Sequence, residues 1–452
     1  MYPAIVVTAF ILALIGIPAG ADLVSPDIPP GMNTSLDPGD DFFSYANDHW
    51  IRDNPVPSGK TFYSAFEEVE GLVDDRVRVL VEDASQDTNA SSGSPTQILG
   101  TFYRAALNDE ANAEIGLTPV RDELDMITNI SDRSGIREVT SNLTAHGLDP
   151  FFVLYIDENP ENRTQLIATI DSGDLTLRYP PFYMFSVDES ARVQDEMKKY
   201  VTSTFERQGA DAESAGEIAD TVFRIEKRLA ESELITNESN GSEENLTAGT
   251  YQVRDLNTIF PGINWESLFA DAGRPDIQEV YIMNPNYVRE VGRIVSTEPV
   301  PDLQSFLTWR LLQFVAPFAT PDMQEAYYRF YESDLSKREL TSQKDRIFDV
   351  MDLYLGNPIA HLYVNHYFSG DDRDKVEDII KNMREVMRER VENLTWMSPE
   401  TKKTALKKMD YLKEQAGYPD TWGEFHNLTL TDRSYLENML SITSYFTNGS
   451  LQ

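Results

Sequence analysis

Apolar side chains recur at three- and four-residue steps through residues 375–394, "KVEDIIKNMREVMRERVENL". These positions are Val376, Ile379, Ile380, Met383, Val386, Met387, Val391 and Leu394. Because an α-helix turns once every 3.6 residues, this spacing places them on one stripe. The stretch that follows opens on Ser398 and Pro399, which start helices, and closes on Gly417, which ends them. Long helices with one apolar stripe are therefore the strongest constraint on the fold.

Helical patterning also covers residues 301–317 and the segment "TVFRIEKRLAESE". One β element is expected within residues 151–172, where two apolar, β-branched runs flank a polar turn containing Asn159 and Pro160. We therefore predict a mainly α fold, a large multi-helix lobe with a small β-hairpin element. No glycine-rich phosphate loop, G-x-S-x-G motif or fixed-period repeat occurs in the sequence.

The charge of the chain excludes one class of partner. It carries 75 acidic and 39 basic side chains, a formal net charge of −36. Binding to a nucleic-acid backbone needs a basic surface, so no nucleic-acid partner is expected. The chain has no cysteine, so its stability must come from packing rather than from disulfides.

Two features indicate export to the cell surface or the extracellular space. Residues 4–17 form an apolar run followed by the small residues 19–21, so residues 1–21 are expected to be a signal peptide or an N-terminal anchor. Contact with a membrane is expected only through such an anchor, and residues 22–35 are expected to be a linker. Eleven N-x-S/T sequons make the protein a candidate glycoprotein. Their asparagines are Asn33, Asn89, Asn129, Asn142, Asn162, Asn237, Asn240, Asn245, Asn393, Asn427 and Asn448.

The stretch "HLYVNHYF" holds two of the five histidines, His361 and His366. A zinc pair on a helix sits at positions i and i+4 with a glutamate between them. These two are five apart, with no acidic residue between, and lie about 140° apart around a helix. His49, His146 and His426 fall in no metal-ligand pattern. We therefore predict structural histidines, no metal ligand and no catalytic residue in this chain.

Several segments, in this order, resemble the N-terminal region of the neprilysin-like (M13) zinc metallopeptidases. The similarity begins at "LDPGDDFFSYANDHW" and continues through "FYRAALND", "TVFRIEKRLAES" and "YQVRDLNTIFPGINW". It is strongest at "DLQSFLTWRLL" and "LTWMSPETKKTALKKMDYLKEQAGYPD". Residues 36–452 are thus expected to form one M13-like N-terminal helical domain. Within it, Trp50, Trp309, Trp396 and Tyr418 are expected to be core anchors.

The resemblance implies a zinc-dependent endopeptidase, but its chemistry lies elsewhere. In the family, an H-E-x-x-H helix and a downstream glutamate hold zinc beyond the region matched here. No H-E-x-x-H occurs in these 452 residues. We therefore expect the zinc catalytic domain to be absent from this chain and the chain to be inactive alone. Its partner would be a catalytic lobe encoded separately or lost, and peptides would be the substrates.

This sequence departs from the family at two further places. Cysteines that relatives often carry are replaced here by Gly39, Asn47 and Ala106. Basic residues with which some relatives hold a peptide carboxylate correspond to Phe62 and Glu70, so the substrate-binding residues remain unknown.

Two other functions stay open. The first is a non-catalytic exported pseudoenzyme that binds peptides or another protein, with no turnover. The second is a self-sufficient hydrolase that uses carboxylates such as Glu67 and Glu68, although so acidic a chain contains many neighbouring carboxylates on solvated faces.

Overall fold

The computed structural model describes residues 31–57, 62–185, 188–234, 246–423, 425 and 428–450. Within these ranges the protein is mainly α-helical with one small sheet, which confirms the predicted fold class. The chain forms two compact units, Met1–Gly100 with Met351–Glu424 (unit 1) and Thr101–Val350 with Phe425–Gln452 (unit 2). The expected signal peptide or anchor lies outside the described residues. None of the helices in the described ranges combines the length and apolar content needed to cross a bilayer.

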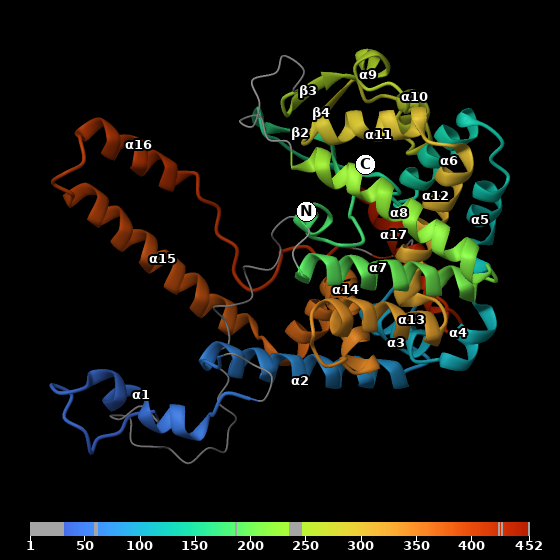
Figure 1. Ribbon diagram of the computed structural model, residues 1–452. Coiled ribbons are helices and arrows are strands. Elements are labelled where there is room, and N and C mark those ends of the chain that lie inside the picture. Colours follow the sequence, from blue (N-terminus) through green and yellow to red (C-terminus); the bar gives the residue numbers. More distant parts are fainter. Residues whose placement is uncertain are drawn as a thin grey trace. The chain divides into compact units, whose positions relative to one another are not determined.

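Unit 1 contains the blue helices α1 (Phe42–Asp53) and α2 (Ala65–Gln86) and the orange helices α15 (Gly370–Asn393) and α16 (Pro399–Asp410) of Figure 1. It also contains parts of α3 (Pro95–Ala106) and α14 (Gln343–Tyr367). Arg76 on α2 donates to the Tyr363 hydroxyl over 3.3 Å. Its guanidinium carbon lies 4.7 Å from the centre of the Tyr367 ring. This cation–π contact and hydrogen bond join α2 to α14.

Helix α14 is bent by its own sequence. Pro358 lies inside the helix, and Leu355 has non-helical torsion angles, φ −121° and ψ 23°. Proline has no backbone N–H to donate, and its ring crowds the carbonyl of the residue four positions earlier, Tyr354. The bend therefore has a local covalent cause.

Helices α15 and α16 form a hairpin that polar contacts close. A capping box at Ser369 and Asp372 starts α15, and the Ser398 side chain caps α16 as predicted. Arg384 donates to the Met409 carbonyl over 2.8 Å, and Arg388 pairs with Asp410 at 2.6 Å. The helix α16 ends at Asp410, so the prediction that it runs to Gly417 is wrong.

Unit 2 is the larger helical body (Figure 1). After α3 its helices are α4 (Asp109–Ile115), η2 (Thr118–Val120), α5 (Arg121–Thr128), α6 (Arg133–Ala145), η3 (Pro180–Tyr183), α7 (Asp188–Arg207), α8 (Ala212–Glu233), α9 (Val253–Ile259), α10 (Trp265–Asp271), α11 (Pro285–Thr297), α12 (Val300–Val315), η4 (Ala316–Phe318), α13 (Pro321–Tyr328), the π-helix η5 (Arg329–Leu335) and α17 (Tyr435–Ser450). The predicted helices of residues 301–317 and 221–233 are confirmed as α12 and the end of α8.

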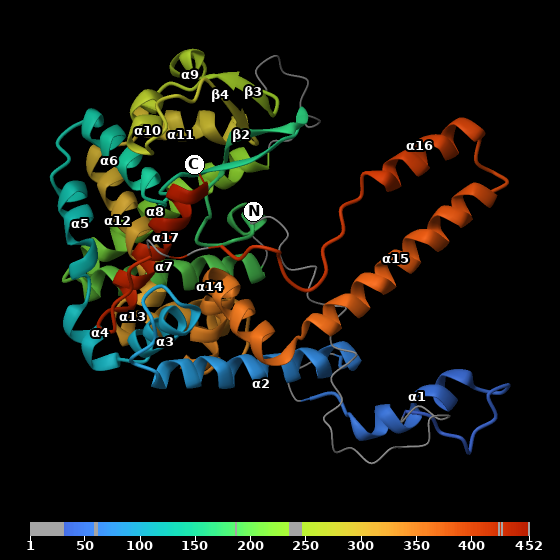
Figure 2. The ribbon, with the colours of Figure 1, turned by 180° about the vertical axis from the view of Figure 1, so that it is seen from behind.

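The sheet of unit 2 has the strand order β1-β2-β4-β3. Its strands are β1 (Phe152–Asn159), β2 (Asn162–Ser172), β3 (Gly249–Gln252) and β4 (Glu279–Ile282). The predicted hairpin is confirmed: β1 and β2 pair antiparallel, with Phe152 opposite Ser172. The sequence did not indicate β3 or β4, which extend the hairpin through a parallel β2–β4 pairing. Both ribbon views place α11 beside this sheet (Figures 1 and 2).

Aromatic side chains fill the core of unit 2. Trp309 is fully buried, so its predicted role as a core anchor is confirmed. Tyr200 stacks on Phe330 with ring centres 4.5 Å apart and meets Trp309 edge to face. The same prediction is wrong for Trp396 in unit 1, whose residue surface is 76% exposed. Trp396 sits in the turn between α15 and α16, which leaves it little to pack against.

Two glycines of unit 2 let backbone meet backbone. Gly262 has a φ of +104°, and a Cβ added there would lie 2.4 Å from the carbonyl oxygen of Gly292 on α11. A Cβ on Gly292 would lie 2.1 Å from the carbonyl oxygen of Pro261. Neither distance is compatible with a side chain, so α11 packs directly on the turn that follows α9.

Replacing Gly292 with alanine is expected to destabilise the protein by about 2–3 kcal/mol, because the helix must move away from Pro261. Gly216, also inside a helix, has no neighbour within 4 Å of an added Cβ. Gly216→Ala is the matched control and is expected to stabilise by about 0.5–1 kcal/mol. Urea unfolding followed by circular dichroism measures both variants. A Gly292→Ala variant that unfolds at the same urea concentration as the unmodified protein would contradict the close approach of α11 to Pro261.

Candidate functional site

The two histidines of the 361–368 stretch contact different groups. His361 on α14 is half-buried and stacks on Trp422, with ring centres 4.7 Å and planes 20° apart. His366 is exposed, and its Nδ1 lies 2.8 Å from the carbonyl oxygen of Leu362 in the same helix. Each ring thus has its own local contact rather than a partner in common with the other.

His361 belongs to a column of planar groups in unit 1. Trp422 also stacks on Tyr418, with planes 10° apart and ring centres 6.0 Å apart. The Arg373 guanidinium lies 4.8 Å from the centre of the Tyr418 ring and pairs with Asp420 at 2.7 Å. The column connects the segment after α16 to α14 and α15, which is a structural role for His361.

The remaining histidines are scattered. His49 is half-buried on α1, and His146 follows α6 with its Nδ1 2.8 Å from the Asn142 carbonyl oxygen. His426 lies outside the described residues. In the described part of the chain, no three His, Cys, Asp or Glu side chains come together in a way that could hold a metal ion.

The acidic residues in the first turns of α2 make structural contacts. Glu67 accepts the Ser64 backbone N–H over 2.8 Å in a capping box at the start of α2. Glu68 accepts the indole N–H of Trp50 over 2.9 Å. Phe62 is exposed, and so is Glu70. This arrangement resembles neither a carboxylate clamp nor an acid–base pair.

A buried carboxylate lies at the centre of unit 2. Glu226 on α8 is fully buried and accepts hydrogen bonds from the backbone N–H and hydroxyl of Thr176, at 3.1 and 2.8 Å. It also accepts from the Tyr183 hydroxyl over 2.5 Å, and Arg310 lies 3.8 Å away. Burial raises the pKa of Glu226, while Arg310 and the hydrogen bonds oppose the shift. The sequence reasoning missed this group, although a glutamate between the apolar positions 222, 225 and 229 is a signal for it.

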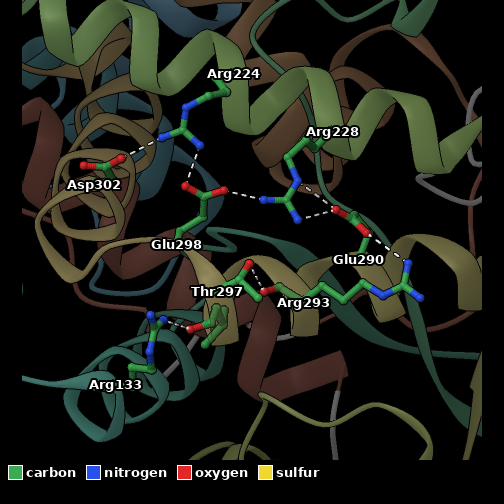
Figure 3. A network of polar contacts seen from close by, with 9 residues as sticks. Arg133, Arg224, Arg228, Glu290, Arg293, Thr297, Glu298 and Asp302 are labelled. Atoms are coloured by element: carbon green, nitrogen blue, oxygen red, sulfur yellow. Dashed lines mark hydrogen bonds and ion pairs between the residues drawn. The ribbon is translucent and has the colours of Figure 1, made fainter.

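A second cluster links α8 to α11 and α12 (Figure 3). Glu298 contacts both Arg224 and Arg228, and its side chain is 9% exposed. Arg224 also pairs with Asp302, and Arg228 with Glu290, each at 2.6 Å. Each arginine of α8 bridges Glu298, which lies between α11 and α12, and a second carboxylate on one of those helices, so the cluster is a structural tie.

One further carboxyl is perturbed. Burial raises the pKa of Asp149 to about 8, with Arg310 lowering it and Asp174 raising it. Asp149 lies in the turn before β1, and Arg310 donates to the carbonyl oxygen of the next residue, Pro150, over 3.1 Å. Hydrolytic chemistry needs such a group in a cleft beside a reacting atom, and Asp149 does not line the 500 Å³ cleft of unit 2.

A cleft of about 500 Å³ lies between α7, α13 and η5 in unit 2. Its three basic side chains each pair with a carboxylate: Lys199 with Glu196, Arg207 with Asp322 and Arg329 with Glu325. Ser203 in this cleft donates to the Tyr200 carbonyl over 3.0 Å. With mixed, paired charges and no histidine beside the serine, the cleft does not show the arrangement of a nucleophilic site.

The sequons fall into three groups in the structure. Asn89, Asn129, Asn162 and Asn393 are exposed. Asn33 and Asn142 are half-buried, and Thr144 of the Asn142 sequon is 2% exposed inside α6. Asn237, Asn240, Asn245 and Asn427 lie outside the described residues, as does the side chain of Asn448.

Comparison with known families decides the identity of this fold. The model of the peptidase family M13 N-terminal region matches residues 38–419. The chain belongs to peptidase family M13. The resemblance seen in the sequence is thereby confirmed.

Curated M13 relatives match almost all of this chain, which spans little more than half of their length. Neprilysin-3 of Drosophila melanogaster is 23% identical over 95% of this chain and 57% of its own length. Human endothelin-converting enzyme 1 is 22% identical over 93% of this chain and 56% of its own length.

Solved M13 proteases share the fold. The open state of the zinc metalloprotease Zmp1 from Mycobacterium tuberculosis matches with a TM-score of 0.82 and 23% identity, over 92% of this chain and 64% of that chain. PepO from Lactobacillus rhamnosis HN001 matches with a TM-score of 0.71 and 19% identity, over 92% of this chain and 66% of that chain. The name of Zmp1 includes zinc, yet the described residues of this M13 chain provide no ligand set that fits a zinc ion.

We expect purified residues 22–452 of this M13 chain to bind no stoichiometric zinc and to cleave no peptide, because His361 and His366 each have separate local contacts. Metal analysis after dialysis against zinc gives the amount of bound zinc, and a peptide-cleavage assay with and without a chelator gives the activity. Tight one-to-one zinc that His361→Ala or His366→Ala removes would contradict the assignment.

Asp149 should make stability depend on pH. The folded carboxyl keeps its proton up to about pH 8, whereas an unfolded aspartate releases it near pH 4, so the folded state binds more protons in between. The free energy of unfolding should therefore fall as pH rises from about 4 to 8. Between pH 5 and 8 the unmodified protein should lose on the order of 1–3 kcal/mol more of its free energy of unfolding than the Asp149→Asn variant loses. The range is set below the full effect of the pKa shift because the Asp149 residue is only half-buried. Asp125→Asn, at an exposed position of α5, is the control, and urea titrations at several pH values give the comparison.

Proposed function

We propose that this chain forms the helical substrate-chamber lobe of an exported neprilysin-like metalloendopeptidase. The observation that carries the proposal is the family match, which runs through both units from residue 38 to residue 419. In this role the lobe shapes the chamber and limits the size of the peptides that enter. It contributes no nucleophile and no metal ligand, in keeping with the separate contacts of its described histidines.

The reaction would require a catalytic H-E-x-x-H segment, in the same polypeptide or in a second one. Zinc held by that segment supplies a Lewis acid and an activated water for peptide hydrolysis. The relatives are longer than the region matched here, which leaves room for such a segment in them. Peptides are the proposed substrates.

Export is the second part of the proposal. It is supported by the apolar run of residues 4–17, by the number of sequons, and by the exposure of four of the sequon asparagines. A membrane would be reached only through an uncleaved N-terminal anchor, and nucleic acid is not a proposed partner.

A chimera tests the catalytic part of the proposal. Residues 22–452 are joined to the part of Zmp1 that lies beyond the matched region, and hydrolysis of short fluorogenic peptides is measured. We expect hydrolysis that a chelator abolishes and that exceeds the hydrolysis by the Zmp1 part alone, because this lobe completes the chamber. A folded protein should not be cleaved.

The control is the same chimera with glutamine in place of the glutamate of H-E-x-x-H, which removes the general base. Peptide binding without chelator-sensitive turnover in the unmodified chimera would favour the pseudoenzyme instead. A chimera that neither binds nor cleaves peptides would contradict both functions.

A further inference from the structure

Arg178, in the segment of unit 2 that precedes η3, holds its guanidinium against two tyrosines. Its guanidinium carbon lies 4.5 Å from the centre of the Tyr331 ring on η5. Its Nη2 donates to the Tyr327 hydroxyl on α13 over 3.1 Å. The two tyrosine rings lie 4.6 Å apart, centre to centre. A cation–π contact together with a hydrogen bond fixes both the plane and the direction of the guanidinium.

The support for Arg178 continues into the core of unit 2. Tyr331 donates to the Thr176 carbonyl over 3.2 Å and accepts a hydrogen bond from the Gln313 side chain over 2.8 Å. Gln313 in turn accepts from Arg310 over 2.7 Å. Thr176 and Arg310 both contact the buried carboxylate at the centre of the unit. Because the guanidinium is held in advance, a ligand that binds it loses little affinity to the ordering of the side chain.

The guanidinium of Arg178 has donors to spare. Among the described residues the Tyr327 hydroxyl is its only hydrogen-bond acceptor, and no carboxylate lies within ion-pair distance of it. Arg224 and Arg228, by contrast, each pair with two carboxylates. Arg178 is also exposed. Its positive charge is therefore available to an anion, although the chain as a whole is acidic.

Exposed aromatic side chains lie in the same segment. Three aromatic side chains are exposed in the described residues of unit 2, and two of them, Tyr179 and Phe185, lie within seven positions of Arg178. Each is 57% exposed. The ring of Phe182 meets that of Tyr179 edge to face, with centres 5.2 Å apart. An arginine beside exposed aromatic rings matches a ligand in which a carboxylate adjoins an apolar group.

We propose that Arg178 binds the C-terminal carboxylate of a peptide whose last residue is aromatic or large and apolar. The guanidinium donates two parallel hydrogen bonds to the carboxylate, and Tyr179 and Phe185 contact the last side chain. The choice of a peptide rests on the proposed function. The site belongs to unit 2, whereas Phe62 and Glu70, at the positions where some relatives carry basic residues, belong to unit 1.

Two other roles for Arg178 explain less of the structure. A purely structural tie to the two tyrosines would leave its other donors to water and would give the exposed aromatic side chains no role. An inorganic anion would use the charge of Arg178 but not the aromatic rings. A carboxylate that ends an apolar peptide uses both.

Calorimetric titration of the purified chain tests the proposal with three ligands. They are N-acetyl-Gly-Phe with a free carboxylate, the same dipeptide with a C-terminal amide, and 3-phenylpropanoate. We expect the free acid to bind at least about tenfold more tightly than the amide, because charge-assisted hydrogen bonds to a fixed guanidinium are lost in the amide. 3-Phenylpropanoate, which lacks the peptide groups, should bind more weakly than the acid.

Variants assign the preference to Arg178. Arg178→Gln should bind acid and amide equally, and Arg178→Lys should regain only part of the preference because an ammonium cannot form two parallel bonds. Asp174 is exposed, and its charge acts on Arg178 without an ion pair. Asp174→Asn should therefore tighten the binding of the acid about twofold. Arg121→Gln, at an exposed arginine of α5, removes the same charge elsewhere and is the matched control, which should bind like the unmodified protein.

Several results would overturn the proposal. These are equal binding of acid and amide, binding of neither, and a preference that survives in Arg178→Gln. If 3-phenylpropanoate binds as tightly as the acid, the ligand is a small carboxylate and the peptide assignment is wrong. A structural tie predicts a lower thermal midpoint for Arg178→Gln with the preference unchanged. If that variant does not fold, Arg178→Lys and Asp174→Asn must still shift the affinity for the acid in opposite directions.

The outcomes are independent of the proposed function, because the titrations need no catalytic segment. Selective binding of the acid together with a chimera that does not cleave peptides would support the Arg178 site and count against the function. A chimera that cleaves peptides while the chain shows no preference for the acid would overturn the site and leave the function standing.

Discussion

The packing of unit 2 depends on one buried carboxylate, that of Glu226. A charge removed from water costs several kcal/mol unless hydrogen bonds and an opposite charge compensate it. Glu226 obtains both from Thr176, Tyr183 and Arg310, which come from the segment after β2, from η3 and from α12. Because Trp309 donates to the Thr176 hydroxyl over 2.9 Å, the same network orients the aromatic core. The network therefore ties α8, η3, α12 and the segment after β2 to one another inside unit 2.

Local signals in the sequence predicted the elements that local chemistry determines. The cap at Ser398, the stripe of residues 375–394 and the turn at Asn159 act within a few residues of themselves, and the structure has the corresponding helices and hairpin. Strands β3 and β4 are only four residues long, and their place depends on β2, more than a hundred positions before β4. So short a strand leaves no periodic signal, and its partner cannot be found without the rest of the fold.

The candidate site likewise contains features that nearby residues determine and features that depend on residues distant in sequence. Five-residue spacing was enough to argue that His361 and His366 are not a zinc pair, because helix geometry alone decides where the two rings point. The stacking of His361 on Trp422, by contrast, needs a segment that returns from beyond α16. Glu226 was missed for a related reason: a single acid in an apolar stripe is informative only when its hydrogen-bond partners, distant in sequence, are known.

Helix α15 shows why periodicity identifies an apolar face but not what covers it. The stripe of residues 376–394 is one continuous pattern in sequence, yet the structure divides it into an edge against α16 and an edge without a described neighbour. Burying one large apolar side chain contributes about 1.5–3 kcal/mol, and the net stability of a domain is only about 5–15 kcal/mol. Ile379, Met383, Val386 and Met387 are already about half-buried, so covering them fully would add about half of that contribution, roughly 3–6 kcal/mol in all. Any contact that covered them would stabilise the α15–α16 hairpin as well as bind it, so folding of the hairpin and binding would be coupled.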